Sequence, residues 1–123
     1  MSHVVEIELQ VKFTDRKTLD AACQRLGLAA PEHKLVQLYS EKAEGLAVEL
    51  PGWRFPIVVD LKKETVKYDN FNGRWGRIEE LTRLEQAYQT EHVLKTARDS
   101  CMFSSINETI LEDGSIQINL MAY

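Results

Sequence analysis

The chain has 123 residues, of which 44% are hydrophobic and 28% charged, a balance that predicts one globular domain over residues 1–123. Fifteen lysines and arginines oppose nineteen aspartates and glutamates, so the formal net charge is -4. This negative charge disfavours general nucleic-acid binding, because a phosphate backbone repels a protein of the same sign.

The N-terminus and the hydropathy of the chain predict a cytoplasmic protein that does not enter a membrane. Met1 to Glu6 contain no basic region followed by an apolar stretch, which a secretory signal peptide requires. No segment approaches the roughly 20 apolar residues that span a bilayer. Cys23 and Cys101 are interpreted as buried thiols, and the sequence leaves open whether they lie near each other.

The first half of the chain predicts a strand, a helix and two hairpins. Apolar and polar residues alternate over Val5–Phe13, which is typical of a strand with one buried face. Thr14 or Asp15 can cap the helix that follows, and Gly27 is placed to end it. The predicted hairpins have strands Leu35–Tyr39 and Leu46–Leu50 around the turn Ser40–Gly45, then strands Ile57–Leu61 and Thr65–Asp69.

The second half predicts a long helix and a third hairpin. A helical stripe of apolar residues runs from Arg77 to about Met102 and weakens near Glu91 and His92, so this helix either bends or packs its halves on different surfaces. The turn Glu112–Ser115 contains Asp-Gly, a hairpin signal. The order β-α-β-β-β-β-α-β-β indicates the α+β class: a twisted, mainly antiparallel sheet with two helices packed on one face.

One stretch carries the residue types that recognise ligands. Lys62–Arg77 holds five basic residues against Glu64 and Asp69, which reverses the sign of the whole chain. Arginines fork onto carboxylates or phosphates and stack on aromatic rings, and glycines just before a helix N-terminus let an anion approach the backbone. The predicted ligand- or partner-binding residues are Trp53, Arg54, Tyr68, Asp69, Asn70, Asn72, Arg74, Trp75 and Arg77.

The competing interpretation is purely structural. Asn70–Gly73 would then be only a turn, with Phe71 and Trp75 packed under the start of the long helix. No Cys-x-x-Cys or His-x-x-x-His pair, nucleophile elbow or phosphate-binding loop occurs, so no catalytic residue, metal or cofactor is predicted.

The order of several short motifs resembles a known family. They are Met1-Ser2-His3, Tyr68-Asp69-Asn70 with Arg74-Trp75-Gly76, Tyr88 with His92-Val93-Leu94, and Glu112-Asp113-Gly114-Ser115-Ile116. Together they resemble the uncharacterised plastid and cyanobacterial open-reading-frame family, a domain of unknown function with bacterial and phage relatives. The resemblance implies a small α+β domain and an accessory role beside an AAA-type ATPase, and it carries over no catalytic residue. Cys101 departs from it, since a helix-ending glycine is expected there.

Three functions compete at this point. The first is a non-enzymatic binding or adaptor module that docks another protein through the aromatic and basic residues. The second is a protein that binds or sequesters a small ligand, a nucleotide or other phosphorylated anion held by Arg74, Arg77 and the helix N-terminus. An enzyme ranks third, and would need His92, Tyr88 and an acid in one cleft. Strand edges could also pair across a two-fold axis in a homo-oligomer.

Overall fold

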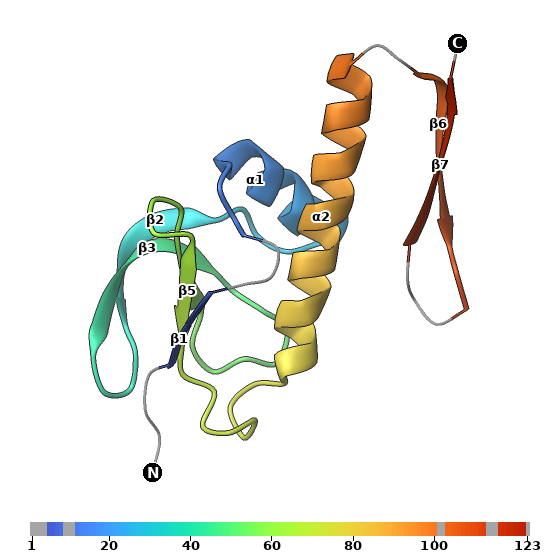
Figure 1. The fold of residues 1–123 in the computed structure, drawn as a ribbon. Helices are drawn as coiled ribbons and strands as arrows, with labels where there is room; N and C mark the ends of the chain where they lie inside the picture. The colour runs from blue at the N-terminus through green and yellow to red at the C-terminus, as the bar shows by residue number, and fades with distance from the viewer. Residues whose placement is uncertain (1–4, 9–11, 101–102, 113–115, 123) are drawn as a thin grey trace. The chain divides into compact units, whose positions relative to one another are not determined.

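The computed structural model describes residues 5–8, 12–100, 103–112 and 116–122, and it confirms the predicted class and order of elements (Figure 1). The elements are β1 (Val5–Glu8), α1 (Arg16–Arg25), β2 (Glu32–Gln37), β3 (Lys42–Val48), β4 (Ile57–Asp60), β5 (Thr65–Tyr68), α2 (Ile78–Ser100), β6 (Phe103–Ile110) and β7 (Ile116–Ala122). The chain divides into two compact units, Met1–Tyr88 and Gln89–Tyr123. The single-domain interpretation therefore stays a prediction.

The first unit contains a five-stranded antiparallel sheet in the order β1-β5-β4-β3-β2. β1 confirms the start of the predicted opening strand, whose residues 9–11 lie outside the described part. The β4–β5 hairpin is confirmed, with each strand one residue shorter than predicted. β5 ends at Tyr68, and β4 ends at Asp60, where the carboxylate accepts the backbone N–H groups of Lys62 and Lys63 and forms the turn.

Helix α1 begins and ends where capping chemistry predicts. The Asp15 carboxylate accepts the Thr18 N–H at 3.1 Å, and Gly27 follows the helix with a φ of 73°. The Tyr88 hydroxyl of α2 accepts the backbone N–H groups of Thr14 and Asp15, each at 3.1 Å. These two bonds tie the start of α1 to α2.

Both helices cover the same face of the five-stranded sheet, as predicted. Alternate residues of β3, β4 and β5 point toward α1 and the first turns of α2, because side chains along a strand alternate between its faces. This helix-covered core consists of Phe13, Leu19, Ala22, Cys23, Leu46, Val48, Leu50, Ile57, Val59, Val66, Tyr68, Leu81, Leu84, Ala87 and Tyr88.

The opposite face of the sheet is covered by the β2–β3 hairpin itself. Val36, Leu38 and Ala43, close to the tip of the hairpin, are buried with Ala47 and Val58 of the sheet. Glu41 at the tip also reaches Lys67 of β5 at 3.8 Å. The hairpin therefore curls over the sheet, a curvature visible in the β2–β3 ribbon of Figure 1.

Gly45 explains where the hairpin bends. A Cβ at this position would lie 2.6 Å from the carbonyl oxygen of Val59, so only glycine permits such close approach of β3 to β4. The predicted turn Ser40–Gly45 and the boundaries Leu35–Tyr39 and Leu46–Leu50 are therefore wrong, because Gly45 lies inside β3 and the turn is confined to residues 38–41.

The long helix and the last hairpin complete the chain. α2 is one helix from Ile78 to Ser100, and the boundary between the two units falls within it, after Tyr88. β6 and β7 form a two-stranded antiparallel sheet of their own and do not join the larger sheet. The predicted Asp113-Gly114 turn and Cys101 lie outside the described residues. Of the helices in the described part, none is long and apolar enough to cross a membrane.

Candidate functional site

The loop between β5 and α2 begins with a left-handed turn. Phe71, Asn72 and Gly73 have φ values of 47°, 53° and 92°. The carbonyl oxygen of Asn70 accepts the N–H groups of Gly73 at 3.0 Å and Trp75 at 2.9 Å. Left-handed backbone costs a non-glycine residue about 1–2 kcal/mol, and surrounding structure must impose it. The loop is therefore held in one strained shape.

Two polar residues brace this loop from inside. The Asp69 side chain is fully buried and its Oδ1 accepts the Phe71 N–H at 3.3 Å, while the Asn70 side-chain amide donates to the Gly76 carbonyl at 3.2 Å. Asp69 Oδ2 forms no hydrogen bond within the described residues. Asp69 and Asn70, both predicted to bind a ligand, shape the loop in this structure.

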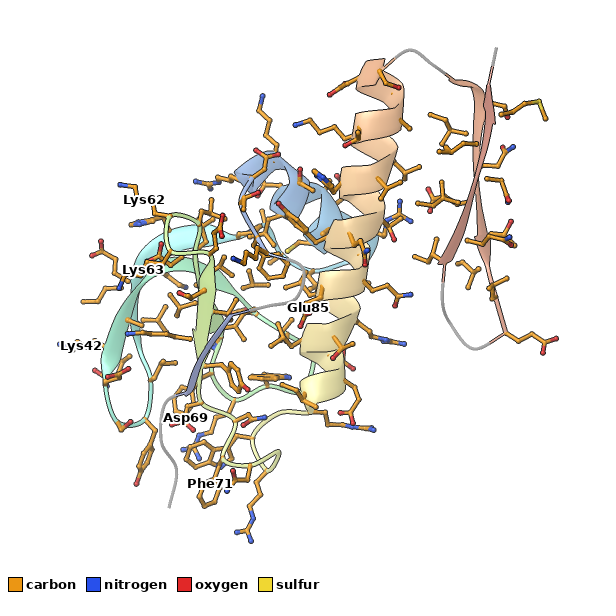
Figure 2. All side chains as sticks on the ribbon, in the orientation of Figure 1. Lys42, Lys62, Lys63, Asp69, Phe71 and Glu85 are labelled. Atoms are coloured by element: carbon orange, nitrogen blue, oxygen red, sulfur yellow. The ribbon has the colours of Figure 1, made fainter. Side chains whose placement is uncertain are left out.

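Aromatic rings from three parts of the chain pack around Trp75. Its ring centroid lies 4.8 Å from that of Phe71, 5.3 Å from Tyr39 and 5.7 Å from Phe55. Tyr39 comes from the tip of the curled β2–β3 hairpin and Phe55 from the loop before β4. The curl of the hairpin therefore brings Tyr39 to Trp75. Phe71, which also contacts Trp75, is labelled in Figure 2.

Two arginines stack on these rings. The guanidinium carbon of Arg54 lies 4.7 Å from the Trp75 centroid and 5.5 Å from that of Phe55, and Arg74 lies 5.2 Å from Phe71. These are cation–π distances. The backbone N–H of Arg54 also donates to the Trp75 carbonyl at 2.8 Å, and this bond joins the loop before β4 to the loop after β5. The four aromatic residues and two arginines, Tyr39, Phe55, Phe71, Trp75, Arg54 and Arg74, are called the Arg–aromatic cluster below.

Among the described side chains, the arginines of the cluster have no acidic partner. In residues 12–100, where every described carboxylate of the first unit beyond β1 lies, no ion pair involves Arg54 or Arg74. Both residues are exposed. An exposed guanidinium beside a ring keeps its N–H donors, so each can fork onto an incoming carboxylate or phosphate.

Trp53 and Tyr68 belong to the core side of the loop. The Trp53 indole N–H donates to the Arg77 carbonyl at 3.0 Å, and its ring meets the Tyr68 ring edge-on at 5.5 Å. Tyr68 is buried in the helix-covered core, and burial raises the pKa of its hydroxyl. These two predicted site residues are therefore structural in their contacts.

The N-terminus of α2 does not have the arrangement predicted for an anion site. Arg77 is exposed and its Nε lies 3.7 Å from Glu79, and both Glu79 and Glu80 occupy the first turn of α2. Carboxylates at that position already satisfy the positive end of the helix dipole. Asn72 is exposed at the turn. Of the nine predicted residues, the structure brings together Arg54, Arg74 and Trp75.

Sequence reasoning missed Tyr39 as a member of the cluster, and Phe55 was considered beside Trp53 and Arg54 but was not among the nine predicted residues. The position of Tyr39 depends on the bend at Gly45, which places it against Trp75. A glycine within an apolar strand pattern was the available signal, since it often marks a tight bend.

The basic residues of Lys62–Arg77 are divided between two places. Lys62 and Lys63 lie at the β4–β5 turn, at the opposite end of β5 from Phe71, as Figure 2 shows. A pocket of about 160 Å³ there is lined by Lys42, Lys63, Lys67, Ala43, Val58 and Thr65, and also by the acids Glu44 and Asp60. Mixed charge makes it a weaker anion site than the Arg–aromatic cluster.

A larger pocket of about 370 Å³ lies between the start of α1 and the sheet. Arg16, His33 and Lys62 line it together with Glu44 and Asp60, above an apolar floor that includes Leu46. Within the described ranges, no group of three or more His, Cys, Asp or Glu side chains is arranged to hold a metal ion.

Comparison of the chain with protein-family models, with curated proteins and with solved structures found no match. The family resemblance and the role it implies therefore stay predictions.

Proposed function

We propose that this chain is a non-enzymatic binding module that docks an acidic segment of a partner protein on the Arg–aromatic cluster. The observation that carries the proposal is that Arg54 and Arg74 stack on aromatic rings without a carboxylate partner in the described residues, although the chain has nineteen acids. A guanidinium held against a ring has already lost part of its side-chain entropy before it binds.

The aromatic part of the cluster supports a peptide segment over a free anion. Trp75 and Tyr39 offer rigid, amphipathic area of the kind enriched at interfaces. Within the described residues the Trp75 indole N–H has no hydrogen-bond acceptor, whereas that of Trp53 does. Tyr39 is 60% exposed. A partner segment that places an apolar side chain on Trp75 and carboxylates on the arginines would use all of these groups.

The alternative, a small phosphorylated anion at the helix N-terminus, is less favoured. It relied on Arg77, which lies beside Glu79, and on a helix end whose first turn carries Glu79 and Glu80. Like charge there repels a phosphate. An AAA-type ATPase, the partner implied by the family resemblance, is the first protein to test for the acidic segment.

Synthetic peptides test the proposal directly. Each peptide of about twelve residues carries one leucine or tryptophan flanked by aspartates and glutamates, and its matched control carries asparagines and glutamines at the acidic positions. Fluorescence anisotropy of labelled peptide should show binding of the acidic series alone, weakened by added salt. Equal affinity of both series, or no binding of either, would rule the proposal out.

Matched variants locate the binding. Arg54→Ala with Arg74→Ala should reduce affinity for the acidic peptide by about tenfold or more, since two charge-assisted contacts are lost. Arg77→Ala and Arg83→Ala remove the same total charge from residues beside Glu79 and Glu80, and should leave affinity within about twofold. If ATP alone stabilises the folded chain and this depends on Arg54 and Arg74, the ligand is a nucleotide and not a protein segment.

A further inference from the structure

The β6–β7 hairpin is a sheet of two strands only. Within residues 103–112 and 116–122, β6 pairs with β7 and each strand has one edge without a neighbour in the sheet. A sheet of two strands is marginally stable in water, and three or more strands, or a covering helix, are needed for independent stability. The open edges of β6 and β7 can therefore pair with a further strand.

The hairpin has two chemically different faces. Residues directly opposite in the register share a face, so Ile106 with Leu120 and Ile110 with Ile116 lie on an aliphatic face that also holds Glu108 and Ile118. Ile110 is 77% exposed and Leu120 41% exposed. The other face carries Asn107, Thr109, Gln117, Asn119 and Met121.

The edge of β7 lacks the features that normally prevent strand pairing. Over Ile116–Ala122 the sequence Ile-Gln-Ile-Asn-Leu-Met-Ala contains no charge, no proline and no glycine. By contrast, the edge strand β2 of the larger sheet carries Glu32, His33 and Lys34 in its first half. Charged residues on an edge discourage pairing with another chain, so β7 is the unprotected edge.

The residues on either side of Asn119 allow β7 to pair with a second copy of itself. Asn119 is the middle of its 7 residues, with Ile118 and Leu120 on either side, Gln117 and Met121 next, and Ile116 and Ala122 at the ends. In an antiparallel pair centred on Asn119, the aliphatic positions Ile118 and Leu120 face each other and the two Asn119 amides meet across the axis. A shift by one residue would join the aliphatic face of one copy to the polar face of the other.

We infer that β7 pairs antiparallel with β7 of a second copy of this chain, about a two-fold axis at Asn119, so that two hairpins form one four-stranded sheet. Centring the axis on Ile118 or Leu120 also keeps like faces together but leaves residues at one end of each strand unpaired. The register centred on Asn119 is therefore favoured. A closed two-fold dimer uses up the β7 edge of both copies and leaves β6, which carries Glu108, at each end of the four-stranded sheet.

A charge exchange at the axis tests this register. Asn119 is exposed on the polar face, so Asn119→Lys and Asn119→Glu should fold as the wild type does. Each variant alone places like charges opposite each other and should weaken the dimer about fivefold or more, and the two mixed should dimerise at least as tightly as the wild type. Light scattering across a dilution series at low salt measures all three.

Asn107→Lys is the matched control, because Asn107 lies opposite Asn119 on the same face but on β6, one strand away from the axis. It should leave the dimer within about twofold of the wild type. A wild type that stays monomeric at about 100 µM would overturn the inference. So would a dimer that Asn119→Lys weakens no more than Asn107→Lys does, because pairing would then use another surface.

Discussion

Trp53, in the loop before β4, and Trp75, in the loop between β5 and α2, have different surroundings. The Trp53 ring packs against the helix-covered core, covers Gly76 and satisfies its indole N–H at the Arg77 carbonyl. The Trp75 ring lies among Tyr39, Phe55, Phe71 and Arg54 and leaves its indole N–H without an acceptor in the described residues.

Exposure alone does not separate these two tryptophans, since both are half-buried. Their neighbours separate them. Trp53 has apolar and backbone partners within the fold, whereas Trp75 carries a stacked arginine, Arg54, that has no acidic partner in the described residues. Of two aromatic residues in neighbouring loops, one can therefore anchor the fold while the other is presented, and a candidate site is better judged by unsatisfied groups than by exposed area.

The largest expected effect is on stability when Trp53 is removed. Trp53→Ala should lower the free energy of unfolding by about 3 kcal/mol, because a large packed ring is lost and the Arg77 carbonyl loses its donor. Trp75→Ala should cost about half as much, since its ring stacks at the surface. Urea denaturation of both variants measures this. A larger loss for Trp75→Ala would reverse the roles assigned to the two residues.

Gly76 tests the same contact with the smallest possible side chain. A Cβ at Gly76 would overlap Cδ2 of Trp53, so Gly76→Ala should destabilise the fold by about 2 kcal/mol through overpacking. In a Trp53→Ala background the ring is gone and the same change should cost less than about 0.5 kcal/mol. Equal costs in both backgrounds would show that the Trp53 ring is not what Gly76 accommodates.

The sequence predicted what depends on local pattern. The opening strand, the Asp15 cap, the Gly27 helix end and the β4–β5 hairpin all follow from period, capping and turn chemistry within a few residues. The structure confirms them. It also answers the question about the long helix: α2 is continuous, and its two halves belong to different units.

The membership of the site depended on contacts between distant residues. Arg54, Arg74 and Trp75 were predicted because arginine forks onto anions and stacks on aromatic rings, and tryptophan supplies a rigid ring with a polar tip. Tyr39 was not, because it reaches Trp75 only through the bend that Gly45 permits. Tyr68 and Trp53 have the same residue types as members of the Arg–aromatic cluster, and only packing shows that they contact the core.

The helix-covered core should also respond to pH through Cys23. Burial, with a smaller contribution from Asp20, raises the pKa of the Cys23 thiol to about 11. In the unfolded chain the thiol ionises at its lower, ordinary pKa, so the unfolded state loses its proton first as the pH rises. The neutral, buried Cys23 thiol therefore contributes its full stabilisation below about pH 8.5. As the pH rises toward 11 that contribution to the free energy of unfolding is lost, by about 1.4 kcal/mol per pH unit at most.

Urea denaturation at about pH 8 and pH 10 measures this loss, which should be about 1–2 kcal/mol. Cys23→Ala keeps the site small and apolar and removes the titrating group. In that variant the loss between the two pH values should shrink by about 1 kcal/mol. An unchanged loss would assign the pH dependence to other groups.

The smallest change in stability is expected on the Trp75 side, at Phe71. Its φ of 47° is strained for a bulky side chain, yet its ring stacks on Trp75 and under Arg74. Asparagine tolerates left-handed backbone, so Phe71→Asn relieves about 1 kcal/mol of strain while it loses stacking of similar size. The free energy of unfolding should therefore stay within about 0.5 kcal/mol of the wild type, whereas affinity for the acidic peptide should fall about fivefold as Arg74 loses its support.

Asn72→Gly relaxes the neighbouring residue without removing a ring and should leave affinity unchanged. If Phe71→Asn destabilised the fold by more than about 2 kcal/mol and left peptide affinity intact, the ring would serve the fold, and the distinction between Trp53 and Trp75 would not hold.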